Sequence, residues 1–425
     1  MTTRWLNRRS VLLVALAAVA ACRPGAVAPS GGTTPDSANI ARDVGYLASD
    51  ALGGRLTGTA GNDSAAAYLA RRYAALGLTA PADGYIQRFI AHPPAHAGQL
   101  ISLPTQNVAA IVRGRDPELR DEYVIIGAHF DHLGTSTDGA LDPQTKGVRL
   151  GADDNASGTA AVLELARLFA RTPARRSILF ANFSGEEQGL LGSEYFVQHS
   201  PVSLVKMDAM LNFDMVGRLR DDRLIVFGVQ TATELPALLD SANDVVRLRV
   251  FGQGDGVGPS DHSSFYLMNI PVLHFFTDVH DDYHKTSDTP DKINAGGEAR
   301  VVALAERVAR SIADRPSRLT YVRLAAPAQS SASQNPARVY LGSIPDMAGS
   351  DTPGLRLSGV TPGSPAELAG LKPGDVIVAF GGKPVKDLYQ YSDALYSHKP
   401  GDDVDVEVMR DGTRLTVRVK LGRRD

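Results

Sequence analysis

The sequence has only one cysteine, Cys22, so no disulfide bond can form within the chain. It also lacks an excess of basic residues: 44 Lys and Arg stand against 47 Asp and Glu, which argues against nucleic acid as the main partner. No apolar run reaches the roughly 20 residues that cross a bilayer, so we expect no membrane-spanning helix. Hydrophobic residues make up 43% of the 425 residues, as in globular proteins, and the length predicts two or three domains.

The N-terminus has the pattern of an export signal. Three arginines (Arg4, Arg8 and Arg9) precede the short apolar run Val11–Ala21, and the letters VAAC, which end at Cys22, resemble a bacterial lipobox. We therefore expect residues 1–21 to be a lipoprotein signal peptide and Cys22 to be acylated, which places the protein in the bacterial cell envelope. There it would be lipid-anchored and extracytoplasmic, at the periplasmic face or the outer membrane. An ordinary signal peptide with a chance cysteine is the alternative, and the paired arginines leave Sec or twin-arginine export open.

Composition divides the rest of the chain into four parts. Residues 22–37 are rich in Pro, Gly, Ser and Thr and predict a flexible tether, and residues 323–337 predict a linker. Between them, residues 38–322 alternate predicted strands and helices, which indicates an α/β fold with a mostly parallel sheet flanked by helices. Residues 338–425 predict a small β-rich domain.

The α/β region has clear periodic segments. The predicted strands are Asn107–Val112, Tyr123–Ala128, Ser177–Phe183, Ala209–Phe213, Leu224–Val229 and Pro271–Phe276. The predicted helices are Thr159–Ala170, Leu190–Gln198 and Val301–Ala313. Several strands are apolar without alternation, as expected where helices cover both faces of the sheet.

Histidines and carboxylates follow these strands at their carboxyl ends. They are His129 and Asp131, Glu186 and Glu187, Asp214, and His284, while Asp154 lies just before a helix. Because ligands bind beyond the carboxyl ends of strands in open α/β sheets, we expect these side chains to converge. Two histidines with three carboxylates form the ligand set of a two-metal site. Because the set mixes imidazole with carboxylate and contains no cysteine, zinc is the leading metal, although Mn²⁺ or Co²⁺ could substitute.

Five motifs carry a family resemblance. GAHFDHLG, GADDNASGTAAVLELAR, FSGEEQGLLGS, LNFDMVG and YHKTSDTPDKI, in this order, resemble the co-catalytic zinc exopeptidases of metallopeptidase family 28 over roughly residues 40–315. The resemblance implies two Zn²⁺ ions held by five ligands and served by three further groups. His129 and Asp214 would hold one ion, Glu187 and His284 the other, and Asp154 both; Glu186 would be the general base, Asp131 would accept a hydrogen bond from His129, and Tyr283 would donate to the oxyanion.

The activity implied is that of an aminopeptidase acting on peptides with a free N-terminus. Carboxypeptidase or dipeptidase specificity stays open, and so does a glutaminyl cyclase, which shares this fold and much of the ligand set. A catalytically dead scaffold is the non-enzymatic alternative. The segment SDHSSF (260–265) also resembles a recurring family segment, and we expect Asp261 and His262 to shape the site without binding metal. The remaining histidines, including His132, are expected in loops or the core.

The C-terminal region resembles a bacterial PDZ domain. The resemblance rests on VYLGSIPD and GLRLSGVTPGSPAELAGLKPGDVIVAFGGKPV. It implies that the backbone N–H groups of Leu341, Gly342 and Ser343 form a carboxylate-binding loop, so that a peptide C-terminus could add as a strand beside it. A PDZ-like module with a blocked groove is the alternative. Apart from the lipid anchor, no membrane contact is expected.

Overall fold

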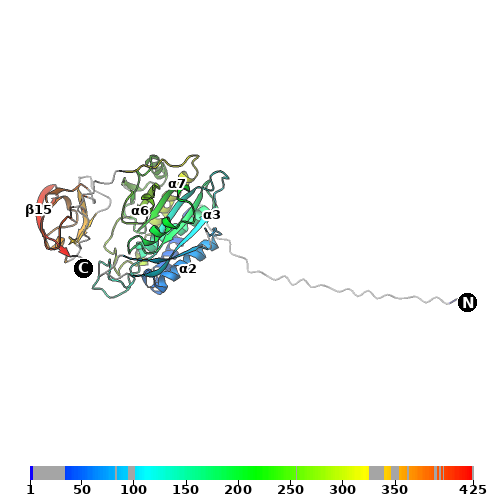
Figure 1. Cartoon of the computed structure of the whole chain (residues 1–425), viewed down its shortest axis with the longest axis horizontal. Helices are drawn as coiled ribbons and strands as arrows, with labels where there is room; N and C mark the ends of the chain where they lie inside the picture. The colour runs from blue at the N-terminus through cyan, green and yellow to red at the C-terminus, as the bar shows by residue number, and fades with distance from the viewer. Residues whose placement is uncertain are drawn as a thin grey trace. The chain divides into compact units, whose positions relative to one another are not determined.

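The computed structural model describes most of the chain (Figure 1). It describes residues 1–2, 34–81, 84–93, 101–254, 256–324, 339–345, 354–360, 363–386, 390–391, 394–395 and 397–423. Cys22, nearly all of the predicted signal peptide and most of the tether lie outside these residues, as does the linker from residue 325 onward. Within the part of the chain that is described, no helix is long and apolar enough to cross a membrane.

The α/β domain is built on an eight-stranded mixed sheet with the order β1-β2-β4-β3-β5-β8-β6-β7. Its centre, β4-β3-β5-β8, is parallel, while β1, β2 and β6 pair antiparallel with neighbours. The strands are β1 (Ile86–Ala91), β2 (Leu103–Val112), β3 (Tyr123–His129), β4 (Ser177–Phe183), β5 (Met207–Phe213), β6 (Arg223–Phe227), β7 (Arg249–Gly252) and β8 (Val272–Phe276). The predicted fold class is therefore confirmed.

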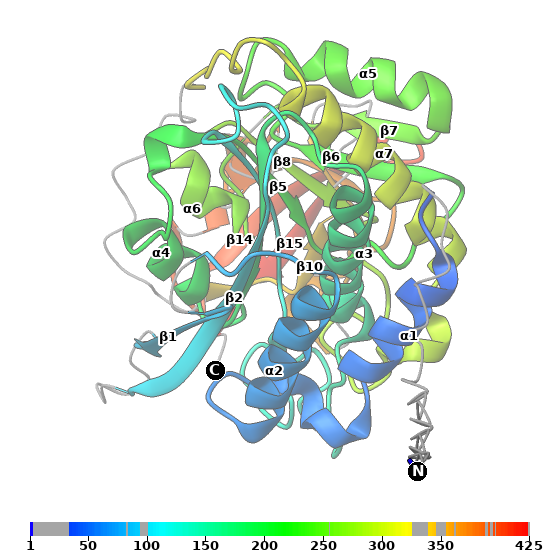
Figure 2. The same cartoon turned by 90° about the vertical axis from the view of Figure 1, so that its right-hand side faces the viewer.

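Helices cover both faces of this sheet (Figure 2). They are α1 (Ser37–Leu47), α2 (Ala60–Ala75), α3 (Gly158–Arg171), α4 (Leu191–Gln198), α5 (Leu235–Val246), α6 (His262–Tyr266) and α7 (Ala295–Ala313). Helices α2, α3 and α7 pack on one face of the central strands, and α4 and α6 pack on the other. Two apolar cores result, which explains why β3 is apolar throughout: Val124 and Ile126 enter the larger core and Ile125 the smaller one.

The α/β domain extends slightly beyond the segment expected from composition. At its start, the Asp36 N–H donates to Glu164 Oε1 at 2.7 Å, and the Thr34 carbonyl accepts from Arg167 Nη2 at 2.8 Å. At its end, the Leu324 N–H donates to the Tyr266 hydroxyl at 2.9 Å. The chain is thus attached to this domain from residue 34 to residue 324.

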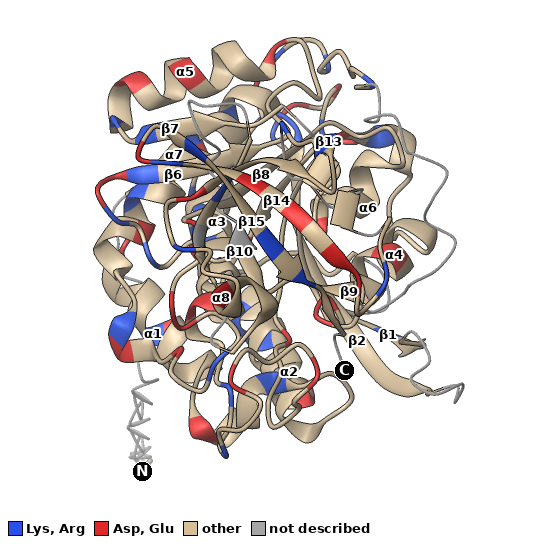
Figure 3. Ribbon diagram, turned by 90° about the vertical axis from the view of Figure 1, so that its left-hand side faces the viewer, with Lys and Arg blue, Asp and Glu red and all other residues tan. Residues whose placement is uncertain are grey.

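The C-terminal domain is a small antiparallel sheet of order β10-β11-β12-β14-β15, with β13 paired to β12. Its elements are β9 (Val339–Tyr340), β10 (Ser343–Pro345), β11 (Leu355–Val360), α8 (Pro365–Leu368), β12 (Val376–Phe380), β13 (Lys383–Pro384), β14 (Asp403–Arg410), β15 (Thr413–Lys420) and β16 (Gly422–Arg423). Acidic residues of β14 face basic residues of β15 (Figure 3), as in the pair between Asp405 and Arg418. Among the described strands, β10 is an edge strand, so one side of it is open to strand addition.

One carboxyl group lies unpaired in the core of the α/β domain. Glu298 of α7 is fully buried, and neither of its carboxyl oxygens has a hydrogen-bond partner among the described residues. Burial, together with the charges of Asp153 and Asp43, raises the pKa of Glu298 well above its usual value. Above the usual pKa of glutamate, the folded state therefore retains this proton to higher pH than the unfolded state does.

We expect the substitution Glu298→Gln to stabilise the protein at neutral and alkaline pH. A carboxyl whose pKa is raised by folding stabilises fully only below its unfolded pKa, and this stability is lost as pH rises towards the folded pKa. The gain in Tm should therefore be several degrees at pH 8 and should shrink towards pH 5. Thermal unfolding across this range measures it, with Glu306→Gln as control because Glu306 of the same helix pairs with Arg310 at 2.6 Å. A gain independent of pH would contradict the expectation.

Candidate metal centre

Elements of the parallel sheet carry the predicted ligands to one edge. His129 is the last residue of β3, and Asp214 directly follows β5. Glu186 and Glu187 lie in the loop after β4, His284 lies in the loop after β8, and Asp154 lies in an irregular helical turn, Ala152–Ser157, before α3. All of these loops leave the carboxyl ends of their strands, so the side chains meet at one rim.

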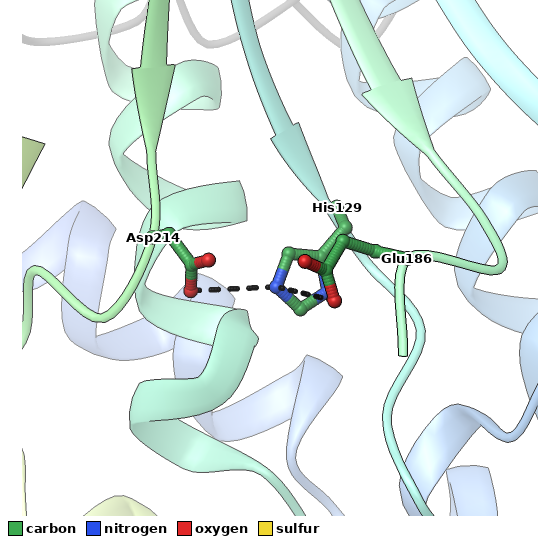
Figure 4. A group of neighbouring side chains, drawn as sticks. All are labelled: His129, Glu186 and Asp214. Carbon is green, nitrogen blue, oxygen red and sulfur yellow. Dashed lines mark hydrogen bonds and ion pairs between the residues drawn. The ribbon is translucent and has the colours of Figure 1, made fainter. Parts of the chain in front are cut away.

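One group of candidate ligands consists of His129, Asp214 and Asp154; we call it the His129 group. Figure 4 shows His129 with Asp214 and Glu186. His129 Nε2 lies 3.4 Å from Asp214 Oδ1 and 3.4 Å from Asp154 Oδ1. Glu186 Oε2 lies farther away, 4.0 Å from the same nitrogen. Glu186 thus stands beside the group without being as close to the ring as the two aspartates.

A second group, the His284 group, shares Asp154 with the first. His284 Nε2 lies 3.0 Å from Asp154 Oδ2 and 3.1 Å from Glu187 Oε2. The two carboxylate oxygens of Asp154 therefore face different imidazoles, Oδ1 towards His129 and Oδ2 towards His284. This is the arrangement that a carboxylate bridging two metal ions requires.

The donor atoms fit zinc in kind and in spacing. Zinc binds imidazole nitrogen and carboxylate oxygen at about 2.0–2.2 Å in tetrahedral geometry, which puts neighbouring ligand atoms about 3.3–3.5 Å apart. The spacings of 3.0–3.4 Å in both groups match this closely. His129 and Asp154 are buried, and the side chains of Glu187, Asp214 and His284 are only slightly exposed, so packing restricts their movement.

The electrostatics of the two groups favour bound cations. Burial alone would lower the pKa of His129, but Glu186 and Asp214 outweigh it and hold that pKa well above its usual value. The pKa of His284 is likewise raised against burial, by Glu187 and Asp154. Burial raises the pKa of Glu186 well above its usual value despite His129, and Asp214 adds to the effect. Four buried carboxylates around two imidazoles thus create a negative potential that two divalent cations would neutralise.

Asp131 accepts hydrogen bonds from two residues next to the candidate ligands. Its Oδ2 accepts from Thr57 Oγ1 at 3.0 Å, and its Oδ1 accepts from the Glu186 N–H at 3.3 Å. The expected acceptance from His129 is not formed in full: Asp131 Oδ1 lies 3.7 Å from Nδ1, beyond hydrogen-bond range, and the Asp131 carbonyl oxygen lies nearer to that nitrogen, at 3.3 Å. The clearest contact of Asp131 within the site is therefore with the backbone of Glu186.

A buried arginine forms hydrogen bonds to the backbone beside two of the predicted ligands, His129 and Asp154. Arg55 donates to the carbonyl oxygens of Phe130 at 2.6 Å, Leu150 at 2.7 Å and Gly151 at 2.9 Å. Phe130 follows the predicted ligand His129, and Gly151 precedes the turn that contains Asp154, so one guanidinium holds both segments. Burial lowers the pKa of Arg55 to about 10, still far above neutrality.

Tyr283 lies directly over the His284 ring, with centroids 3.9 Å apart and planes inclined by 28°. Burial and the charges of nearby carboxylates raise the pKa of Tyr283 well above its usual value. The hydroxyl therefore stays protonated and can act as a hydrogen-bond donor.

Two residues at the site were not expected there. His132, expected in a loop or the core, is a fully buried residue of the loop after β3, and its Nδ1 lies 2.7 Å from Glu187 Oε1. Within SDHSSF, Ser260 makes the direct contact, since its Oγ donates to Asp214 Oδ2 at 2.8 Å. Asp261 is fully buried beside it, and burial raises its pKa to about 7. The sequence offered one indication of this position: His132 follows the predicted ligand His129 by three residues in the same motif, GAHFDHLG.

The predicted carboxylate-binding loop of the C-terminal domain joins β9 to β10. Leu341 is buried, and Gly342 has a positive φ of 84°. A Cβ at Gly342 would lie 2.2 Å from Ser364 Cβ, so the position requires glycine for both reasons. Ser343 Oγ lies 2.5 Å from the Tyr391 hydroxyl. Cys22, the predicted lipidation site, lies outside the described residues and stays a prediction.

Known proteins resemble the chain in both sequence and fold. A "Probable zinc metalloprotease" of Pyrenophora teres f. teres (strain 0-1) is 34% identical over 167 residues, which span 39% of this chain and 30% of that protein. The Legionella pneumophila LapA aminopeptidase superposes with a TM-score of 0.52 at 24% identity over 66% of this chain and 72% of its own. A glutaminyl cyclase of Bacteroides thetaiotaomicron superposes with a TM-score of 0.53 at 20% identity, over 65% of this chain and 98% of its own. These superpositions show the fold.

The sheet, with its ligand-bearing rim, thus has the fold of the zinc exopeptidases. Residues 107–309 match the model of peptidase family M28, and residues 339–421 match that of the PDZ domain. Both resemblances drawn from the motifs are therefore confirmed, that of the α/β domain to peptidase family M28 and that of the C-terminal domain to the PDZ domain.

Proposed function

We propose that the protein is a two-zinc aminopeptidase. The observation that carries the proposal is Asp154, whose two carboxylate oxygens each face a different imidazole at 3.0–3.4 Å, with Glu186 beside the His129 group. A site with two metal positions and a free carboxylate suits hydrolysis by an activated water. Zinc bound in the two groups would supply Lewis acidity, polarising the scissile carbonyl and lowering the pKa of a water.

The chain's own residues have separate tasks in this proposal. Glu186 takes the proton of the attacking water and returns it to the leaving amine, and its raised pKa brings it nearer to the range where a general base works best. Asp131 holds Glu186 in place through the Glu186 N–H. Tyr283, which stays protonated, donates to the carbonyl oxygen as negative charge develops on it.

The fold does not discriminate between hydrolysis and cyclisation, because solved proteins of both kinds superpose equally well. Purified protein should contain two zinc ions and release the anilide from aminoacyl-anilides. A glutaminyl cyclase would instead convert an N-terminal glutaminyl substrate to pyroglutamyl product. N-acetylated peptides test for a carboxypeptidase, since an aminopeptidase or a dipeptidase would need the free N-terminus. Cyclisation without hydrolysis would overturn the proposal.

The PDZ domain is proposed to hold the C-termini of long substrates. The loop at Gly342 adjoins the edge strand β10, which can pair with an added peptide strand. All proposed ligands lie before residue 285, and the Ala- and Ser-rich linker separates the two domains. Binding of a peptide's C-terminus would raise the local concentration of its N-terminus near the metal centre.

A chain that ends at Ser333 should therefore keep kcat/KM for an aminoacyl-anilide nearly unchanged. For a peptide long enough to reach from Gly342 to the metal centre, kcat/KM should fall, because the second attachment is lost. The same long peptide with an amidated C-terminus is the control, since it should lose the advantage in the intact protein too. Equal losses on the short and long substrates would mean that the PDZ domain only supports the catalytic domain.

We also propose that the protein is anchored in the cell envelope by acylated Cys22. Cys22→Ala should move the protein from the membrane fraction to the soluble fraction or leave its leader uncleaved. A single lipid-bearing residue supplies the anchor in this proposal, and no membrane-spanning helix is present among the described residues to replace it. Fractionation with immunodetection measures the change. Membrane association that persists in the alanine variant would refute the lipobox interpretation.

A further inference from the structure

His132 is a fully buried histidine in direct contact with the metal centre. Its Nδ1 lies 2.7 Å from Glu187 Oε1 and 3.7 Å from Asp154 Oδ2. The edge of its ring also contacts the His284 ring, with centroids 5.7 Å apart and planes at 70°. His132 therefore contacts Glu187 and His284 from the buried interior of the domain.

The direction of its hydrogen bond follows from the partners. An ionised carboxylate can only accept, so a contact of 2.7 Å requires the proton on His132 Nδ1. His132 Nε2 is buried without a hydrogen-bond partner among the described residues, so Nδ1 is the ring nitrogen that is placed to donate.

The two carboxylate oxygens of Glu187 have different partners. Oε1 accepts the hydrogen bond of His132, while Oε2 lies 3.1 Å from His284 Nε2. The ring of His132 cannot move away from Glu187 easily, because it lies against the backbone of Gly151. A Cβ at Gly151 would approach His132 Cγ to 2.4 Å. Glycine at this position thus makes room for the imidazole.

We propose that His132 is a positioning residue of the His284 group: its Nδ1–H holds Glu187 so that Oε2 alone is presented to a metal ion. The inference rests on the proposed function only in that Glu187 binds metal. Residues that orient a metal ligand in this way change metal affinity by about 10- to 100-fold when they are lost. His132 should therefore control how firmly one of the two zinc ions is held.

Three substitutions at residue 132 test the proposal. Zinc affinity is measured on the full chain by titration against a chelator of known affinity, and bound zinc is counted by mass spectrometry. In His132→Asn the side-chain amide can occupy the place of Nδ1 and still donate to Glu187, whereas His132→Gln reaches the place of Nε2, and His132→Leu donates nothing. His398→Leu is the matched control, because it removes a partly buried imidazole that packs on Phe380 in the C-terminal domain.

We expect the leucine and glutamine variants to bind one of the two zinc ions about 10- to 100-fold more weakly. The asparagine variant at residue 132 and the His398→Leu control should stay within about three-fold of wild type. If leucine prevents folding, judged by circular dichroism, the asparagine–glutamine pair decides alone. If asparagine and glutamine weaken zinc binding equally, His132 is a direct ligand or a space-filling group. If no variant weakens zinc binding, His132 does not position Glu187. Either result overturns the proposal. A wild-type protein without zinc would instead refute the proposed function itself.

Discussion

Replacing Glu186 with glutamine is expected to lower kcat by about 10²- to 10⁴-fold while leaving two zinc ions per chain. The change removes the general base but keeps the volume of the side chain and leaves its N–H contact with Asp131 intact. Glu186 Oε2 is also the most distant of the carboxylate oxygens around His129 Nε2, at 4.0 Å, so metal binding should depend on it least. Aminoacyl-anilide hydrolysis and metal analysis of the same preparation measure both parts.

Glu194→Gln is the matched control for this variant. Glu194 is an exposed glutamate of the neighbouring helix α4, and its replacement should change neither activity nor zinc content. Activity of the Glu186 variant within a few-fold of wild type would show that another group is the base. Loss of zinc would show instead that Glu186 is a ligand.

Replacing Asp154 with asparagine is expected to remove both zinc ions and with them the activity. Asparagine replaces one carboxylate oxygen by an NH₂ group, which cannot bind a cation, and removes the negative charge that both groups share. The comparison variant is Asp214→Asn. Asp214 belongs to the His129 group only, so this change should weaken the binding of one zinc ion and leave the binding of the other unchanged. Zinc counts after dialysis distinguish the two. Two fully bound zinc ions in the Asp154 variant would contradict its bridging role.

Strong periodic segments of the sequence predicted their elements well. Ser177–Phe183 is predicted and observed as a strand with the same bounds, because a run of apolar residues without alternation forms a strand only where both faces are covered. The edge strands β1 and β7 were not predicted: β7 is short and only partly buried, and β1 has a mixed burial pattern. Edge strands of this kind have little hydrophobic periodicity to detect.

The PDZ domain shows how a single backbone position changes an element. Residues Val339 to Ile344 are mostly apolar or aromatic, and their sequence suggests a single strand. The structure divides it into β9 and β10, because Gly342 adopts a positive φ and packs tightly against Ser364. The contact with Ser364 depends on a residue more than 20 positions away, so no local pattern could reveal it.

For the metal centre, the sequence by itself determined which residue types end which strands. Because parallel strands present their carboxyl ends at one edge, His129, Glu187 and Asp214 had to approach each other once the strands were placed. Only the tertiary structure decided that His132 joins them. Alternation along an extended strand would put residues 129 and 131 on one side and residue 132 on the other, but β3 ends at His129. Beyond that point the path of the chain is set by long-range contacts, such as those of Arg55 with Phe130 and Gly151, and these turn His132 onto Glu187.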